Sequence, residues 1–146
     1  MIEDMLIMVD TQDRPLGPCK KMQAHQSARL HRAFSVFLCC DGNMLLQRRA
    51  AGKYHSGGLW ANACCSHPRW GETLGEAVTR RLWEELNICP PVNELFSFLY
   101  MAEFSNGLSE YELDHVFLGE CDQIPDFAPS EISEMRFVSF SQLRKE

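Results

Sequence analysis

The sequence predicts one α/β (α+β) domain, spanning residues 1–146, in which helices flank a mixed β-sheet. Two observations lead to this fold class. Segments with strand character lie on both sides of one strongly amphipathic helix, which is the order expected of a mixed sheet. The chain also contains no repeat, low-complexity stretch or linker, and its 146 residues suffice for one buried core.

Strand character dominates the part of the chain before the helix. The segment LHRAFSVFLCC is rich in β-branched and aromatic residues and ends at Asp41-Gly42, a two-residue hairpin signal. The residues after this turn should therefore return as an antiparallel partner. The strands expected here are residues 5–10, 30–40, 43–49 and 59–66, separated by the turn-rich residues 11–18, the Asp41-Gly42 turn and the glycine-rich residues 51–58.

The periodicity changes between Thr73 and Leu86. Apolar residues recur every four positions in this segment, which predicts one apolar face of a helix. Pro90-Pro91 prevents any continuation of the helix beyond the segment NIC. The residues that form the apolar face are Leu74, Val78, Leu82 and Leu86.

The remaining chain is again predicted to form strands. Two long segments surround the turn signal Asn106-Gly107, and a further strand leads into the start of a last helix. The expected strands are residues 95–104, 108–120 and 135–140, and the last helix begins in residues 141–146.

Charge and composition exclude several classes of function. The formal net charge of −6 argues against nucleic acid as a partner, and no apolar run approaches the ~20 residues of a membrane helix. The acidic N-terminus does not fit a signal peptide, and the seven cysteines are best explained as reduced thiols. We therefore expect a cytoplasmic protein, a monomer, that binds neither nucleic acid nor membrane. Any anionic substrate must be attracted by a local basic cluster or a bound metal ion.

The helical segment GETLGEAVTRRLWEEL carries the first functional signal. Its pairs Arg80–Glu84 and Arg81–Glu85 are four residues apart, a spacing that solvated helices also use for ordinary ion pairs. Over about sixteen positions, however, the segment resembles the Nudix box of diphosphate-processing enzymes. In that family, helix carboxylates hold Mg²⁺ against a diphosphate, which suits a hard cation.

Three departures from the Nudix box bear on the reaction. Arginine stands at position 81 where the family has a glutamate, Asn87 replaces the usual glycine after the helix, and ACCSHPRW replaces the glycine-led first half. The missing glutamate removes a metal-binding carboxylate that hydrolysis needs. Arg81 can instead contact a diphosphate, while Glu85 remains as a ligand for Mg²⁺.

Histidines and a carboxylate pair suggest a second metal site. A lone histidine is more often structural than a ligand, but three are candidates here: His25, His31 and His67. Glu110 and Glu112 are two residues apart on a predicted strand, so they project from one face and repel unless a positive charge lies between them. A His₃Glu₂ site would meet that need, and its mixed donors suit Mg²⁺, Mn²⁺ or Zn²⁺. His55 and His115 are interpreted as structural.

Cys64 and Cys65 are adjacent on a predicted strand and should point to opposite faces. Cys65 shares its face with His67, which places one thiol beside the proposed metal site. Cys64 points away and is expected to behave as a small buried hydrophobe.

Taken together, HQSARLH, LWANACCSHP, the altered helix and EYE resemble type 1 isopentenyl-diphosphate isomerases, which have a Nudix fold. The resemblance extends from Lys21 to Phe140 and includes a His25–His31 spacing one residue shorter than is usual. It implies a Nudix-like fold and assigns roles to twelve residues. These roles are catalysis by Cys65, Glu112 and Tyr100; metal binding by His25, His31, His67, Glu110 and Glu112; a substrate-dependent Mg²⁺ at Glu85; and diphosphate binding by Lys21, Arg49, Lys53 and Arg81.

The implied reaction moves a double bond between isopentenyl and dimethylallyl diphosphate. One proton is added and another is removed two carbons away, through a tertiary carbocation. A thiol and a carboxylate that flank the allylic unit could perform both transfers. Their ordinary pKa values of about 8.5 and about 4.3 must then be retuned by their surroundings.

Two alternatives belong to other classes: a Nudix hydrolase of a nucleoside diphosphate derivative and a non-catalytic diphosphate-binding or metal-binding domain. A hydrolase should retain the glycine-led half-box and a glutamate at position 81. The resemblance also leads one to expect a C-terminal helical lid with a tryptophan, and here this lid is apparently shortened. Either Trp60 and Tyr100 supply an aromatic wall, or another segment or subunit closes the site, or the site is open and the enzyme is slow. We expect a more exposed site with a compact alternative closure.

Overall fold

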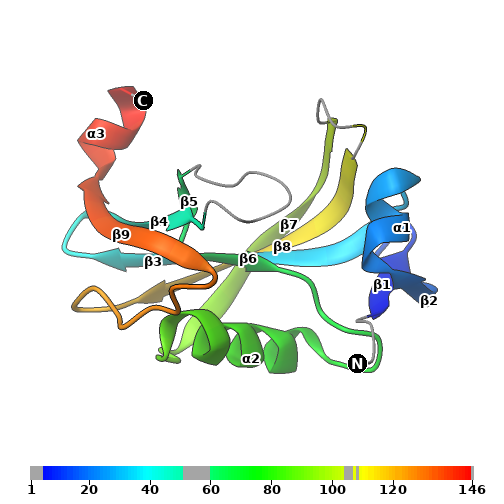
Figure 1. The fold of residues 1–146 in the computed structure, drawn as a ribbon, viewed down its shortest axis with the longest axis horizontal. Helices are drawn as coiled ribbons and strands as arrows, with labels where there is room; N and C mark the ends of the chain where they lie inside the picture. The colour runs from blue at the N-terminus through cyan, green and yellow to red at the C-terminus, as the bar shows by residue number, and fades with distance from the viewer. Residues whose placement is uncertain (1–4, 51–59, 104–106, 108, 146) are drawn as a thin grey trace.

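The computed structural model describes residues 5–50, 60–103, 107 and 109–145. Along the chain these residues form strands and three helices around one sheet (Figure 1). The elements are β1 (Met5–Val9), β2 (Pro15–Lys20), α1 (Lys21–Gln26), β3 (His31–Cys40), β4 (Asn43–Arg49), β5 (Trp60–Asn62), β6 (Cys64–Ser66), α2 (Leu74–Leu86), β7 (Val92–Glu103), β8 (Ser109–Glu120), β9 (Ile132–Ser139) and α3 (Phe140–Lys145).

β3 is the centre of the sheet. It pairs antiparallel with β1, β4 and β6 and parallel with β8. β8 also pairs antiparallel with β7, and β4 pairs antiparallel with β5 and β9. Parallel and antiparallel pairs therefore occur in one sheet, and the predicted mixed sheet is confirmed.

α2 lies beneath the sheet in Figure 1, and its ends follow from its sequence. Thr73 and Glu76 form a capping box, in which each side chain accepts a hydrogen bond from the backbone N–H of the other. At the C-terminal end, Asn87 adopts a left-handed conformation with φ of 55°. Glycine and asparagine tolerate this conformation best, which explains how asparagine can replace glycine at this position.

The main core lies between α2 and the sheet. The predicted face of α2 supplies Val78, Leu82 and Leu86, which are all buried, while Leu74 packs at the margin. The sheet supplies residues from β3, β4, β6, β8 and β9. These residues are Phe34, Val36, Leu38, Leu45, Cys64, Phe117, Ile132 and Met135.

Some local predictions were wrong. β2 begins at Pro15 inside the segment expected to be a turn. In the part of the chain that the structure describes it pairs with β1 alone, and an outer strand tolerates proline. α1 was not predicted because its six residues are too few for a periodic pattern. β7 begins at Val92, three residues earlier than expected, and β9 begins at Ile132 instead of Met135. Within the single strand expected over residues 59–66, Trp60–Asn62 and Cys64–Ser66 form two short strands, and Leu59 lies outside the described residues.

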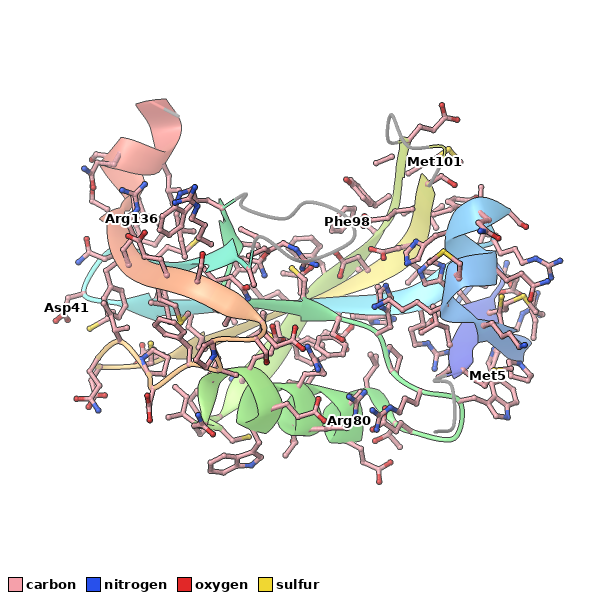
Figure 2. All side chains as sticks on the ribbon, viewed as in Figure 1. Met5, Asp41, Arg80, Phe98, Met101 and Arg136 are labelled. Carbon is pink, nitrogen blue, oxygen red and sulfur yellow. The ribbon has the colours of Figure 1, made fainter. Side chains whose placement is uncertain are left out.

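Among the described residues, β7 pairs only with β8, and it exposes side chains on both faces. Phe98 and Met101, labelled in Figure 2, extend from opposite faces of this strand. No helix within the described ranges has the length and apolar character needed to cross a membrane.

Candidate active site

The sheet register brings together residues that are far apart in the sequence. His31 of β3 is paired with Glu112 of β8, and Glu112 is paired on its other side with Tyr100 of β7. Further along β3, Ser35 is paired with Cys65 of β6. One face of the sheet thus carries the histidine, carboxylate, phenol and thiol that the sequence analysis singled out.

A pocket of about 370 Å³ opens over this face. Nine of the twelve predicted site residues line it, although they come from six different segments of the chain. These nine are Lys21, Arg49, Cys65, His67, Arg81, Glu85, Tyr100, Glu110 and Glu112. Trp60, Phe98 and Tyr100 give the pocket an aromatic wall, as expected for the first and last of these.

Two histidines and one carboxylate form a group that could hold a metal ion. The ligand atoms of His31, His67 and Glu112 all lie within 4.8 Å of one another. His67 Nε2 lies 2.8 Å from Glu112 Oε2, and His31 Nε2 lies 3.5 Å from the same oxygen. Imidazole and carboxylate are suitable donors for several divalent cations.

Backbone carbonyls fix the tautomers of two histidines. His31 Nδ1 donates to Arg29 O at 2.8 Å, and His25 Nδ1 donates to Ser109 O at 3.0 Å. Since carbonyl oxygens only accept, Nδ1 carries the proton in both rings and each neutral ring has its lone pair on Nε2. Metal-binding histidines commonly have this arrangement. The buried Nε2 of His31 forms no hydrogen bond among the described residues, so the donor set fits a metal ion.

The electrostatics of the group favour the protonation states that ligands require. Burial lowers the pKa of His67 and keeps its imidazole neutral. Burial alone would raise the pKa of Glu112, but the neighbouring imidazoles of His31 and His67 outweigh it and hold that pKa well below its usual range. A proton must lie between His67 Nε2 and Glu112 Oε2 at 2.8 Å, and a divalent cation would take its place.

The two adjacent cysteines point in opposite directions, as predicted. Cys64 is fully buried, and its Sγ donates to Glu85 Oε2 at 3.0 Å. Cys65 is exposed as a residue, and its Sγ lies in the pocket, 2.9 Å from Asn62 Oδ1 and 3.8 Å from Ser35 Oγ. Desolvation in the pocket and the nearby carboxylate of Asp114 raise the pKa of the Cys65 thiol to about 12.

Arg81 connects the pocket to carboxylates of α2 and of the segment before β9. It lies 2.7 Å from Glu84, 3.3 Å from Glu85 and 3.5 Å from Glu131. Burial lowers the pKa of Arg81, but these carboxylates outweigh it and raise the pKa, so the guanidinium keeps its charge. Glu85, Glu131 and Arg81 all face the pocket and combine anionic oxygens with a cation there.

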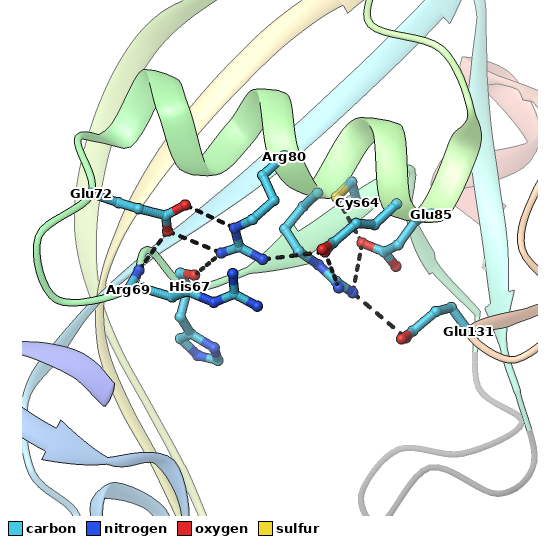
Figure 3. A network of polar contacts seen from close by, with 9 residues as sticks. Cys64, His67, Arg69, Glu72, Arg80, Glu85 and Glu131 are labelled. Atoms are coloured by element: carbon cyan, nitrogen blue, oxygen red, sulfur yellow. Dashed lines mark hydrogen bonds and ion pairs between the residues drawn. The ribbon is translucent and has the colours of Figure 1, made fainter. Parts of the chain in front are cut away.

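Arg80, the neighbour of Arg81, has a structural position (Figure 3). It contacts both carboxylate oxygens of Glu72, at 2.8 and 3.0 Å, and Glu84 at 3.2 Å. It also donates to the backbone oxygen of His67 at 3.4 Å. Arg80 therefore ties α2 to the segment that presents the His67 imidazole.

The remaining predicted residues lie at the edge of this arrangement or outside it. The ring of His25 is 5.7 Å from that of His31 and 6.0 Å from that of His67, but His25 does not belong to the three-residue group. Glu110 faces the pocket without joining that group. Lys53 and His55 lie outside the described residues. His115 is buried away from the pocket, between Asp13 and Glu94.

Sequence reasoning missed five polar residues of the pocket: Ser35, Asn62, Ser66, Asp114 and Glu131. Asp114 accepts a hydrogen bond from Ser35 Oγ at 2.8 Å, and burial raises the pKa of its carboxyl to about 6. Strand alternation could have revealed Asp114, because it continues the spacing of Glu110 and Glu112. Ser35 and Asn62 carry no such signal.

Comparison with known proteins agrees with this geometry. The model of the NUDIX domain matches residues 29–146. An "Isopentenyl-diphosphate Delta-isomerase 2" from Photorhabdus laumondii is 47% identical over 98% of this chain and 81% of its own length. A protein of the same name from Aromatoleum aromaticum is 47% identical over 97% of this chain and 76% of its own length.

Solved structures support the fold. A Deinococcus radiodurans protein has a TM-score of 0.77 at 24% identity and covers 96% of this chain and 86% of its own. A MutT NUDIX hydrolase from Burkholderia pseudomallei has a TM-score of 0.64 at 21% identity, with coverages of 77% and 84%. At these identities the likeness concerns the fold alone. The family match and the close relatives together show that the chain belongs to the NUDIX family and, within it, to the isopentenyl-diphosphate Delta-isomerases.

Proposed function

We infer that this chain is an isomerase that interconverts isopentenyl and dimethylallyl diphosphate. The observation that carries this inference is the placement of Cys65 and Glu112 in one pocket, beside a group that could hold a metal ion. A hydrolase has no need of a thiol at this position, and Arg81 stands where a hydrolase of this family would have a glutamate.

We propose that the diphosphate is bound at one end of the pocket by Lys21, Arg49 and Arg81, with Lys53 as a further ligand from outside the described residues. The charges of the first three converge on the pocket although the chain as a whole carries a formal charge of −6. Charge-assisted hydrogen bonds to an anion contribute roughly 1.5–3 kcal/mol each. This local basic cluster therefore supplies the attraction that the overall field cannot.

Cys65 and Glu112 are the proposed proton-transfer groups. When one of them protonates the terminal alkene carbon, its bond to hydrogen breaks and the substrate becomes a tertiary carbocation. The other group removes a proton from the carbon two positions away, and the electrons of that C–H bond form the new double bond. Tyr100, paired with Glu112 across β7 and β8, assists the carboxylate.

The carbocation must be protected from water until the second transfer. Trp60, Phe98 and Tyr100 line the pocket, and aromatic faces both exclude water and stabilise a cation. The exposure of Cys65 supports our expectation of an accessible site.

We propose that His25, His31, His67, Glu110 and Glu112 hold Mn²⁺, Mg²⁺ or Zn²⁺ and that Glu85 holds a second Mg²⁺ with the diphosphate. When bound, these ions would supply positive charge that neutralises the carboxylates and the substrate. The orientations of His25 and His31, whose Nδ1 atoms are bound to backbone carbonyls, support the first site. We also propose that the protein is a cytoplasmic monomer that binds neither nucleic acid nor membrane.

Incubation with isopentenyl diphosphate and Mg²⁺ or Mn²⁺ in D₂O tests the assignment. The expected product is dimethylallyl diphosphate that carries deuterium, detected by mass spectrometry. Release of inorganic phosphate or pyrophosphate without isomerisation would replace the isomerase by the hydrolase alternative. Tight substrate binding without any reaction would favour the non-catalytic alternative.

A further inference from the structure

The side-chain amide of Asn62 lies beside the reactive thiol, and its orientation is fixed by two backbone groups. Asn62 is the last residue of β5. Its Nδ2 donates to Val36 O at 2.9 Å and to Cys64 O at 3.0 Å. A flipped amide would place Oδ1 against both carbonyl oxygens, so only one orientation satisfies the contacts.

This orientation leaves Oδ1 facing Cys65. The distance from Cys65 Sγ to Asn62 Oδ1 is 2.9 Å. An amide oxygen has lone pairs and no proton, so the S–H must be the donor. Ser35, the second polar neighbour of Cys65 Sγ, is also an acceptor for the thiol. Its hydroxyl already donates its proton to Asp114 Oδ2 at 2.8 Å, so only its lone pairs are left for Cys65.

We propose that Asn62 is a positioning residue for the Cys65 thiol: its locked amide accepts the S–H and holds the sulfur in place between proton transfers. The role rests on the proposed function, since it serves the proton transfer assigned to Cys65. After Cys65 accepts a proton, the new S–H turns to Oδ1. Before Cys65 donates, the S–H leaves Oδ1 by rotation about the Cβ–Sγ bond.

The same segment offers a matched control. Gln47 of β4 is buried, and its Nε2 donates to Ala63 O at 2.7 Å. This amide braces the connection between β5 and β6, as Asn62 does, but the described contacts of Gln47 do not include Cys65. Loss of the Gln47 amide should therefore destabilise the segment without freeing the thiol.

Infrared spectroscopy of the S–H stretch tests the proposal without requiring activity. The Cys65 band is identified as the band lost in Cys65→Ala, and a hydrogen-bonded S–H absorbs at lower wavenumber than a free one. We expect a low band in the wild type, a shift to higher wavenumber in Asn62→Ala and no shift in Gln47→Ala. A wild-type band at the position of a free thiol would overturn the proposal, and this reading needs no Asn62 variant to fold.

Kinetics give the second readout. Asn62→Ala should lower kcat about 10- to 100-fold with little change in KM, because a misplaced reacting group costs rate while the diphosphate contacts remain. Gln47→Ala should lower Tm, whereas its kcat should fall much less than that of Asn62→Ala. Equal loss of kcat in the two variants at equal loss of Tm would overturn the positioning role. If the wild type does not isomerise, the proposed function fails, and the infrared shift still decides whether Asn62 holds the thiol.

Discussion

His67 and Glu112 meet at 2.8 Å although His67 directly follows β6 and Glu112 lies near the start of β8. Both strands are neighbours of β3, and the β3 register decides that the two side chains converge. In this contact, one proton lies between the imidazole nitrogen of His67 and the carboxylate oxygen of Glu112. A metal ion bound by both groups would take the place of that proton. Several properties of the protein should depend on this relationship.

Metal binding should depend on Glu112 and not on a carboxylate that contacts a histidine elsewhere in the structure. A ligand that binds only the folded state raises Tm by mass action, so Mn²⁺ or Zn²⁺ should raise Tm in the wild type. Glu112→Gln should abolish most of this rise. Glu94→Gln is the matched control, since Glu94 bonds His115 at 2.9 Å outside the three-residue group. Equal metal-induced shifts in the two variants would remove Glu112 from the metal site.

Cys65 and Cys64 should show opposite effects on activity and stability. Cys65→Ala should lower kcat by about 10²- to 10⁴-fold, because a positioned proton donor or acceptor is lost. Cys64→Ala should retain most activity but lower the free energy of unfolding by about 1 kcal/mol, because Cys64 is fully buried in the core. Steady-state kinetics and denaturant melts measure both. Comparable activity in the two variants would contradict the assignment of the thiol.

Substrate affinity should depend on Arg81. Arg81→Gln should raise KM for the diphosphate substrate by about tenfold or more, which corresponds to one charge-assisted hydrogen bond. Arg32→Gln serves as the control, because Arg32 pairs with Asp13 at 2.8 Å and does not line the pocket. If KM changes equally in both variants, Arg81 does not bind the substrate.

Asp114 should make the protein less stable as pH rises through the acidic range. Its folded-state pKa is raised to about 6, whereas an unfolded aspartate titrates near 3.9. Between about pH 4 and 6 the folded state thus binds more protons than the unfolded state. The free energy of unfolding therefore falls as pH rises through this range, by about 3 kcal/mol at most. Denaturant melts of chelator-treated protein should show this slope, and Asp114→Asn should reduce it. An unchanged slope in Asp114→Asn would refute the assignment.

The sequence revealed the parts of the fold that repeat a pattern or match a motif. α2 was predicted from its four-residue apolar period, and the hairpin between β3 and β4 from Asp41-Gly42. α1 and β2 escaped because they are short and their stability comes from packing on β1 and β8, which no local pattern encodes. β7 begins directly after Pro90-Pro91, earlier than expected. The two prolines end a helix, but they do not prevent a strand from starting at the next residue.

The candidate site was also predicted only in part, because only some of its residues belong to a recognisable motif. Residues in motifs, such as Cys65 and Glu112, were identified and do share one pocket. Asn62 and Ser35 were missed because their importance depends on register. β6 pairs Cys65 with Ser35, and the amide of Asn62 donates to both members of the pair Val36–Cys64 in β3 and β6. Such relationships across strands arise only when the sheet is assembled.

This pocket should isomerise an isoprenoid diphosphate and should not hydrolyse a nucleoside diphosphate derivative. The most direct measurement offers isopentenyl diphosphate and ADP-ribose together, with Mg²⁺ and Mn²⁺, and follows both by ³¹P and ¹H NMR. Dimethylallyl diphosphate should accumulate while both compounds keep their diphosphate bonds. Cleavage of ADP-ribose with isopentenyl diphosphate unchanged would contradict the assignment as an isomerase.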